Sequence, residues 1–249
     1  MRRRDWSGIG PGKSFALILF FCASVARADD YLSLVTEYSP PYSMTVQGEE
    51  AGIATNIVRA ILGQAQIGYH IREYPWSRAY HEALLHSNTC VYLTTMTERR
   101  KPLFRWVGPI VRDSWVAFAI ETNTVRIGSL DDLNAYRLGT SLGSARSAFL
   151  SDNNLAPHEV LTDELNINML ENGRIDFWVA SQRRGEYLIR SHRVDNIRPV
   201  FSLSRVEYYL ACNKNTPSAV IDRLNDAIQA LGEGRREDAL NADMLTLLR

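Results

Sequence analysis

Residues 31–65 read YLSLVTEYSPPYSMTVQGEEAGIATNIVRAILGQA, and this stretch decides the class of fold. Leu32, Leu34 and Val35 predict a short buried strand over 31–36, which Pro40-Pro41 ends. Over 52–65 the apolar residues recur at helical spacing, which predicts an amphipathic helix. A buried strand followed by such a helix is the unit from which parallel α/β sheets are built.

The same alternation continues through most of the chain. It predicts a mostly parallel sheet with helices on both faces. Further strands are predicted at 69–74, 90–95, 115–120, 137–140, 159–161 and 174–180, and helices at 76–85, 144–150, 163–171 and 183–191, with a short helix capped by Ser129. The pattern changes at two strand-like runs, 198–203 and 206–212, followed by a helix with Thr216 as cap and Pro217 at its first position, and by a last helix at about 238–248.

The first 28 residues have the three parts of a secretory signal. Three arginines and Lys13 precede the apolar run 15–25, and Ala26-Arg27-Ala28 offers small residues for cleavage after Ala28. The run of about 11 residues is too short for a bilayer core of ~30 Å, which takes ~20 helical residues. We therefore expect a mature protein in the periplasm of a Gram-negative bacterium. An uncleaved anchor is an alternative, and so is a lipid on Cys22, although bulky Phe21 precedes it.

Composition excludes several partners. The whole sequence has 28 basic and 28 acidic residues. Five of the basic residues and one of the acidic residues lie in the first 28 positions, so the mature chain has 23 basic and 27 acidic residues. Nucleic-acid binding would want a clustered basic surface, which we do not expect. The five histidines lie apart, and two cysteines remain after cleavage, so neither a metal nor a cofactor is expected.

Five motifs, in this order, resemble those of the family 3 periplasmic solute-binding proteins, the polar amino-acid-type receptors of ABC importers. The resemblance covers nearly all of the mature chain, and its strength lies in the order of motifs that are weak singly. The first motif is Glu37 with Pro40-Pro41-Tyr42 and Gly52-Ile53, and the second is Pro75-Trp76-Ser77-Arg78-Ala79. The third is Thr97-Glu98-Arg99-Arg100 together with residues 104–109. The fourth is the segment 129–133, and the fifth is Gly173-Arg174-Ile175-Asp176.

This resemblance implies an α/β, two-lobe periplasmic-binding-protein-like (type II) fold with two crossing hinge strands. Lobe one would take 29–113 and 207–249, and lobe two 114–206 including the hinge strands. The ligand would bind in the cleft between the lobes, which hinge motion closes. The implied protein is a monomer whose partners are a small-molecule ligand and an inner-membrane ABC permease.

Arg100 matches the arginine that clamps the ligand carboxylate in this family. A guanidinium fork suits the task because it pairs with a carboxylate through two parallel charge-assisted bonds. Thr95 and Thr97 would add a hydroxyl and backbone donors beside it. If the alignment with the family motif is off by one residue, Arg99 is the clamping arginine instead. The other alternative is that residues 99–101 are simply a solvent-exposed basic turn.

Arg78 either faces the cleft or pairs with Glu82, four residues on, as an ordinary surface pair. Trp76 and Tyr42 are either cleft walls or lobe-one core, since aromatic faces suit both.

In lobe two, Ser141, Gly143 and Ser144 precede a helix whose free N–H groups would attract an anion. A plain helix cap is the alternative for these residues.

Two positions depart from the family pattern. Counting five residues from Asp176 gives Ser181, where amino-acid receptors of this family usually carry the aspartate that holds the ligand ammonium. Either Glu37, at the end of the first strand, replaces that anchor, or the ligand is not a standard α-amino acid. The Gly-x-x-Asp element expected before the third strand reads Ser87-Asn88-Thr89-Cys90.

The resemblance therefore implies a receptor that presents a small polar, carboxylate-bearing, amino-acid-like molecule to an ABC importer. A ligand-sensing receptor that signals to a membrane partner is the alternative on the same scaffold. A cyclic-acid dehydratase-type enzyme is less favoured, because the sequence shows no nucleophile motif and one cleft acid, Glu37, is not an acid/base pair.

The fold that the resemblance implies also brings Cys90 and Cys212 together. Cys90 opens the third strand of lobe one, and Cys212 closes the antiparallel strand that returns beside it. A bridge needs Cα atoms within ~7 Å, and close thiols tend to pair in the oxidising periplasm. Two separate buried thiols are the alternative.

Overall fold

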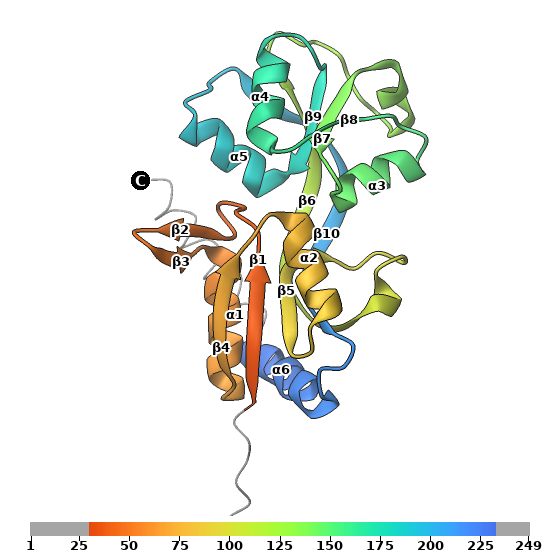
Figure 1. Ribbon diagram of the computed structural model, residues 1–249. Helices are drawn as coiled ribbons and strands as arrows, with labels where there is room; N and C mark the ends of the chain where they lie inside the picture. The colour runs from red at the N-terminus through yellow and green to blue at the C-terminus, as the bar shows by residue number, and fades with distance from the viewer. Residues whose placement is uncertain (1–29, 233–249) are drawn as a thin grey trace, which may run out of the picture.

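The structure, a computed structural model, describes residues 30–232. The predicted signal segment, its cleavage site after Ala28 and the helix predicted at 238–248 lie outside these residues. One eight-stranded sheet runs through the molecule in the order β4-β1-β5-β10-β6-β9-β7-β8. Its outer strands form two groups, each covered by its own helices, with β6 and β10 passing between them (Figure 1).

The first half contains the parallel units that the sequence predicts. β1 (Tyr31–Thr36) lies between β4 (Gly68–Glu73) and β5 (Thr89–Thr95) and runs parallel to both. α1 (Ile53–Ala65) and α2 (Trp76–Leu85) connect them, and α1 buries eight residues on its sheet-facing side. A small hairpin that the sequence patterns did not predict, β2 (Met44–Val46) with β3 (Glu49–Ala51), precedes α1.

Two long antiparallel strands connect the halves. β6 (Phe104–Ile120) and β10 (Ile197–Asn213) have 17 residues each and pair along most of their length. The prediction of one short strand at 115–120 and two separate runs near 200 and 209 was therefore wrong in extent. β10 remains one strand because irregularities at Pro199/Phe201, Ser202/Ser204 and Tyr208/Leu210 absorb extra residues without ending the pairing. These antiparallel pairs make the sheet mixed rather than mostly parallel.

The second half repeats the α/β arrangement. β7 (Leu138–Ser141) runs parallel to β8 (His158–Val160) on one side and to β9 (Phe177–Ser181) on the other. Its helices are α3 (Ala145–Asp152), α4 (Asp163–Glu171) and α5 (Gln182–Ser191). They enclose two apolar clusters, one on each side of the sheet.

Two predicted helix caps are wrong. η2 (Asp131–Ala135) is a 3₁₀ helix that begins after Leu130, and its Asp132 carboxylate accepts the N–H groups of Gly128 and Ser129 instead of Ser129 capping it. α6 (Ser218–Leu231) begins one residue later than predicted, so Pro217 occupies the cap position. The Thr216 hydroxyl is buried there and has no partner in the described structure.

The chain returns to the first half after β10. α6 packs against α1, and its Ile221, Leu224 and Ile228 share one apolar cluster with Ile57 and Ile61. The lobe boundaries given above, 29–113 with 207–249 and 114–206, stay predictions because parts of the chain lie outside residues 30–232.

The predicted disulfide is present. Cys212 of β10 lies directly opposite Cys90 of β5 in the antiparallel register, and their sulfur atoms are bonded. Both side chains are buried. The bond closes a loop that contains the whole second half of the molecule.

No helix among residues 30–232 combines the length and the apolar character needed to cross a bilayer. In the same range, no three His, Cys, Asp or Glu side chains gather in a way that suits a metal ion.

Candidate ligand-binding cleft

A cavity of about 660 Å³ lies between the two halves. Residues at or just beyond the carboxyl ends of parallel strands form much of its wall, which is where open α/β sheets bind ligands. They are Glu37 after β1, Thr95 of β5, Ser141 of β7, Leu161 after β8 and Ser181 of β9.

Arg100 lines this cavity as an unneutralised cation. Its guanidinium carbon lies 5.3 Å from the ring centroids of both Trp76 and Tyr80. A tight turn positions it, because its backbone N–H bonds the carbonyl of Thr97 at 2.9 Å. Burial lowers the pKa of Arg100, and nearby Tyr80 and Glu37 partly offset this. Within residues 30–232 no carboxylate forms an ion pair with Arg100, so the guanidinium is available to an anionic ligand.

Glu37 faces the same cavity as an acid without a partner in the described structure. Burial raises the pKa of its carboxyl group, and the charges of Arg184, Arg146 and Arg100 partly counter that rise. No ion pair or hydrogen bond to its carboxylate forms among the described side chains. Glu37 and Arg100 therefore offer opposite charges, neither held in an ion pair within the described residues, to one ligand.

We expect Glu37→Gln to raise the free energy of unfolding of the unliganded protein at neutral pH. The folded-state pKa of Glu37 is raised, so ionisation there opposes folding, and glutamine removes that effect. The gain should disappear as pH falls below the usual pKa of about 4.5, where glutamate is protonated in both states. Urea unfolding at both pH values tests this, with Glu73→Gln at the cavity rim as control. Equal stability of wild type and Glu37→Gln at pH 7 would contradict it.

Asp163 organises the opposite wall. It is buried, and it accepts bonds from Arg184 Nε at 2.6 Å, Ser141 Oγ at 2.7 Å and Trp178 Nε1 at 3.2 Å. Arg146 Nη2 approaches the same carboxylate at 3.3 Å. Burial alone would raise its pKa, but Arg146, Arg184 and the bonds to Ser141 and Arg184 lower it to about 2. Both carboxylate oxygens are thus occupied, and Asp163 has no acceptor left for a ligand ammonium.

Ser181, which stands where the family usually has its amine-binding aspartate, is also occupied. Arg146 Nη1 donates to Ser181 Oγ at 3.3 Å, and the Tyr208 hydroxyl bonds the same oxygen. Glu164, the other acid of this wall, pairs with Arg184 at 3.6 Å. No free carboxylate therefore lines the second half of the cavity, within the residues described, which leaves Glu37 of the first half as the acceptor best placed for a cation.

The structure brings most of the predicted site residues together. Those that line the cavity are Glu37, Tyr42, Trp76, Thr95, Arg100, Ser141, Gly143, Ser144 and Ser181. The Tyr42 hydroxyl is bonded to Asp113, so this residue serves as wall. The Ser144 hydroxyl accepts Ser147 N–H at 3.1 Å as the cap of α3. The anion-binding role predicted for that helix start would therefore rest on the backbone N–H groups of Ala145 and Arg146.

Two predicted residues lie elsewhere. Arg78 forms the surface pair with Glu82 at 3.5 Å and stacks on Tyr74 at 4.0 Å, and it is not part of the cavity wall. Thr97 supports Arg100 from outside the cavity, its hydroxyl 3.3 Å from Arg100 N.

Sequence reasoning missed Arg146, Asp163 and Arg184. Their one local signal was position: Arg146 follows the end of β7, Asp163 follows β8 and Arg184 follows β9, and ligand-facing groups in α/β sheets lie after such strand ends.

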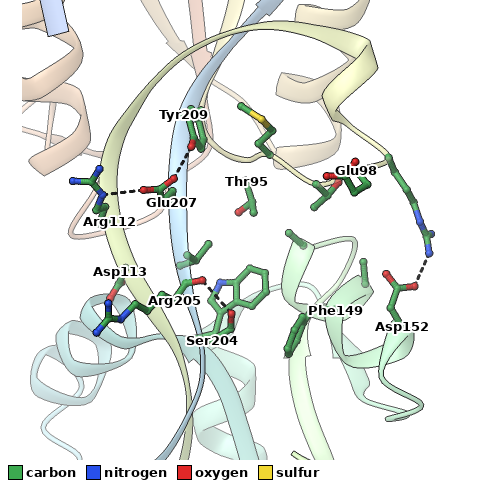
Figure 2. A pocket seen from close by; sticks show the side chains of 17 residues that line it. Thr95, Glu98, Arg112, Asp113, Phe149, Asp152, Ser204, Arg205, Glu207 and Tyr209 are labelled. Atoms are coloured by element: carbon green, nitrogen blue, oxygen red, sulfur yellow. Dashed lines mark hydrogen bonds and ion pairs between the residues drawn. The ribbon is translucent and has the colours of Figure 1, made fainter. Parts of the chain in front are cut away.

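A second cavity of about 770 Å³ lies on the other side of Thr95, Trp115 and Ala145, which line both spaces. Figure 2 shows its rim, where Arg112 pairs with Glu207 and Tyr209 donates to the same carboxylate. Across its opening, Arg99 Nη2 of the first half reaches Asp152 of α3 at 2.6 Å. Arg99 is therefore engaged away from the ligand cavity.

A second contact joins the halves on the other flank. Arg184 Nη1 lies 3.3 Å from both Ser39 Oγ and the Pro40 carbonyl of the first half. Together with the Arg99–Asp152 pair, it means that the halves already touch on two sides of the cleft.

No family model and no curated protein matches the sequence. Solved structures do match. A histidine kinase sensor domain with similarity to periplasmic binding proteins aligns with a TM-score of 0.77 at 20% identity, over 88% of this chain and 98% of that chain. An ancestral arginine-binding protein bound to arginine gives 0.73 at 18% identity, over 85% of this chain and 97% of that one. An amino acid ABC transporter substrate-binding protein from Streptococcus pneumoniae, bound to L-arginine, aligns with a TM-score of 0.75 at 14% identity, over 88% of this chain and 96% of that chain.

These matches establish the architecture. The chain has the α/β type II fold of the periplasmic binding proteins, as the sequence predicted, over most of its length. Identities of 20% and below carry the fold alone, so the ligand has to be argued from this chain's own cavity.

Proposed function

We propose that this chain is a periplasmic receptor that binds a small, carboxylate-bearing, amino-acid-like molecule and presents it to an inner-membrane ABC importer. One observation carries the proposal: Arg100 and Glu37 face one interlobe cavity with opposite charges, and neither forms an ion pair among residues 30–232. Buried charges left uncompensated are costly, so such a pair suits a ligand that supplies both counter-charges.

Each group has a defined role in this binding mode. Arg100 holds the ligand carboxylate with its planar fork, while Trp76 and Tyr80 restrict the guanidinium. From the other half, the first N–H groups of α3 add donors to the same carboxylate. Glu37 accepts the ligand ammonium. Because donors from both halves would hold the ligand carboxylate, the ligand stabilises the closed arrangement.

Two of the matched structures support an amino-acid-like ligand, since both are complexes with arginine. The histidine kinase sensor domain favours a second candidate, a sensory receptor that passes its ligand-bound state to a membrane partner. The gene neighbourhood separates the two: adjacent permease and ATPase genes support transport, and an adjacent membrane kinase supports sensing.

A dehydratase-type enzyme would need an acid and a base of tuned pKa in the cavity. Glu37 supplies one raised pKa, and Asp163 is held ionised by two arginines. The cavity thus suits binding better than proton transfer.

A thermal-shift screen of amino acids, dicarboxylates and polyamines tests the proposed function. A ligand that binds the native state raises its stability by mass action, by about 2.7 kcal/mol at one hundred times Kd. We expect Tm to rise with at least one carboxylate-bearing amine. No shift with any carboxylate would overturn the proposal.

With a ligand from that screen, Arg100→Ala should weaken binding by about 2–5 kcal/mol, because it removes one partner of a buried charge pair. Titration calorimetry measures the loss. Arg99→Ala is the matched control, since Arg99 is the neighbouring arginine and pairs with Asp152 outside the cavity. If Arg99→Ala abolishes binding and Arg100→Ala does not, Arg99 is the clamp.

A further inference from the structure

Three large apolar side chains remain exposed at the mouth of the ligand cavity. Leu161 is 78% exposed, Leu142 54% and Tyr38 52%, and all three belong to the cavity lining. Leu161 is the most exposed large apolar residue within residues 30–232. Exposed apolar residues that cluster beside a cavity indicate a binding surface.

The backbone places the two leucines side by side. Ser141 of β7 and Val160 of β8 are partners in the parallel register, and Leu142 and Leu161 come directly after them. Leu142 N–H donates to the Val160 carbonyl at 2.8 Å, which holds the two loops together beyond the strand ends. The leucines therefore form one apolar edge of the second half.

Aromatic residues of the first half line the same cavity. Tyr74, Pro75 and Trp76 come from the β4–α2 junction. The charged groups of the opposite wall lie deeper, since Asp163 and Arg184 are buried and Arg146 is nearly so. The cavity thus changes from charged at depth to apolar at its mouth.

Its volume exceeds what a small free amino acid fills. The halves already touch through Arg184 with Ser39 and through Arg99 with Asp152, so the 660 Å³ does not come from widely separated halves. Cavities of roughly 300–1,000 Å³ accommodate drug-sized ligands.

We propose that the ligand carries an apolar arm beyond its charged head, and that the arm lies between Trp76 of the first half and Leu142 with Leu161 of the second. The substrate class is an amino acid with a long apolar or aromatic extension. This inference rests on the proposed function, which supplies the carboxylate and ammonium head.

The test is calorimetry of the mature protein with ligands that share one zwitterionic head and differ in arm length: L-alanine, L-norleucine, L-phenylalanine and O-benzyl-L-serine. We expect affinity to rise along the series by about tenfold or more, because each buried methylene contributes about 0.8 kcal/mol. If alanine binds as tightly as the longest member, the arm proposal fails and the proposed function survives. If none of the four binds, the amino-acid head fails, and the arm with it.

The double variant Leu142→Ser/Leu161→Ser should weaken binding of O-benzyl-L-serine about tenfold more than it weakens binding of L-alanine. Leu85→Ser is the matched control, because Leu85 is 73% exposed at the end of α2 and does not line the cavity. Unchanged affinity for the long ligand in the double variant would overturn the proposal.

Discussion

Reduction of the Cys90–Cys212 disulfide is expected to lower the free energy of unfolding by about 4–5 kcal/mol. The two residues are 122 positions apart, and a cross-link that closes so long a loop removes much conformational freedom from the unfolded chain. Urea unfolding of the oxidised and reduced protein measures the change, and the reduced wild type is its own control because no side chain is replaced.

Thiol counting checks the bond itself. We expect the denatured mature protein to show no free thiol without reductant and two with it, since Cys22 belongs to the predicted signal. Two free thiols without reductant would mean that the bridge does not form in the periplasm.

Replacement of Asp163 by asparagine is expected to destabilise the protein by about 3–5 kcal/mol, because it leaves Arg184 and Arg146 buried beside a neutral group. The pH dependence gives an independent readout. The folded-state pKa of Asp163 is lowered from 3.8 to about 2, so its stabilising contribution is complete above pH 3.8 and is lost as pH falls toward 2. Wild type should lose this part of its stability over that interval, and Asp163→Asn should not.

Asp152→Asn provides the control for this prediction. Asp152 also pairs with an arginine, but Arg99 and Asp152 are both exposed, and exposed pairs contribute about 0–1 kcal/mol. Equal losses in Asp163→Asn and Asp152→Asn would show that the buried network adds no more than a surface ion pair.

The sequence predicted most accurately those helices and strands whose ends are marked by nearby residues such as proline or glycine. The bounds of β1, α2 and α4 agree with the sequence prediction, since apolar periodicity and flanking proline or glycine define them within a few residues. The continuity of β6 and β10 escaped prediction because each strand passes from one half to the other. Polar residues and register shifts interrupt its apolar pattern where the surroundings change.

In the candidate site, too, a residue in a short local segment was predicted, and a network of residues distant in sequence was not. Arg100 was predicted because the short segment Thr97-Glu98-Arg99-Arg100 resembles that of the family, and the turn from Thr97 that positions it lies within this segment. The network of Asp163 was not, since Arg146 lies 17 residues before it and Arg184 lies 21 residues after it. Only the packed sheet brings these groups together, and no spacing rule connects them.

The position of β10 in the sheet has a consequence for biosynthesis. β10 lies between β5 and β6, yet it is the last strand of the described chain to be made. If the predicted signal exports the chain N-terminus first, β5 has an unpaired edge until about residue 213 has crossed the membrane, and an unpaired edge can pair with other chains. The strands β7, β8 and β9 are close in sequence and can assemble while β5 is still waiting. A periplasmic chaperone would be needed most by the part of the protein that is translated first.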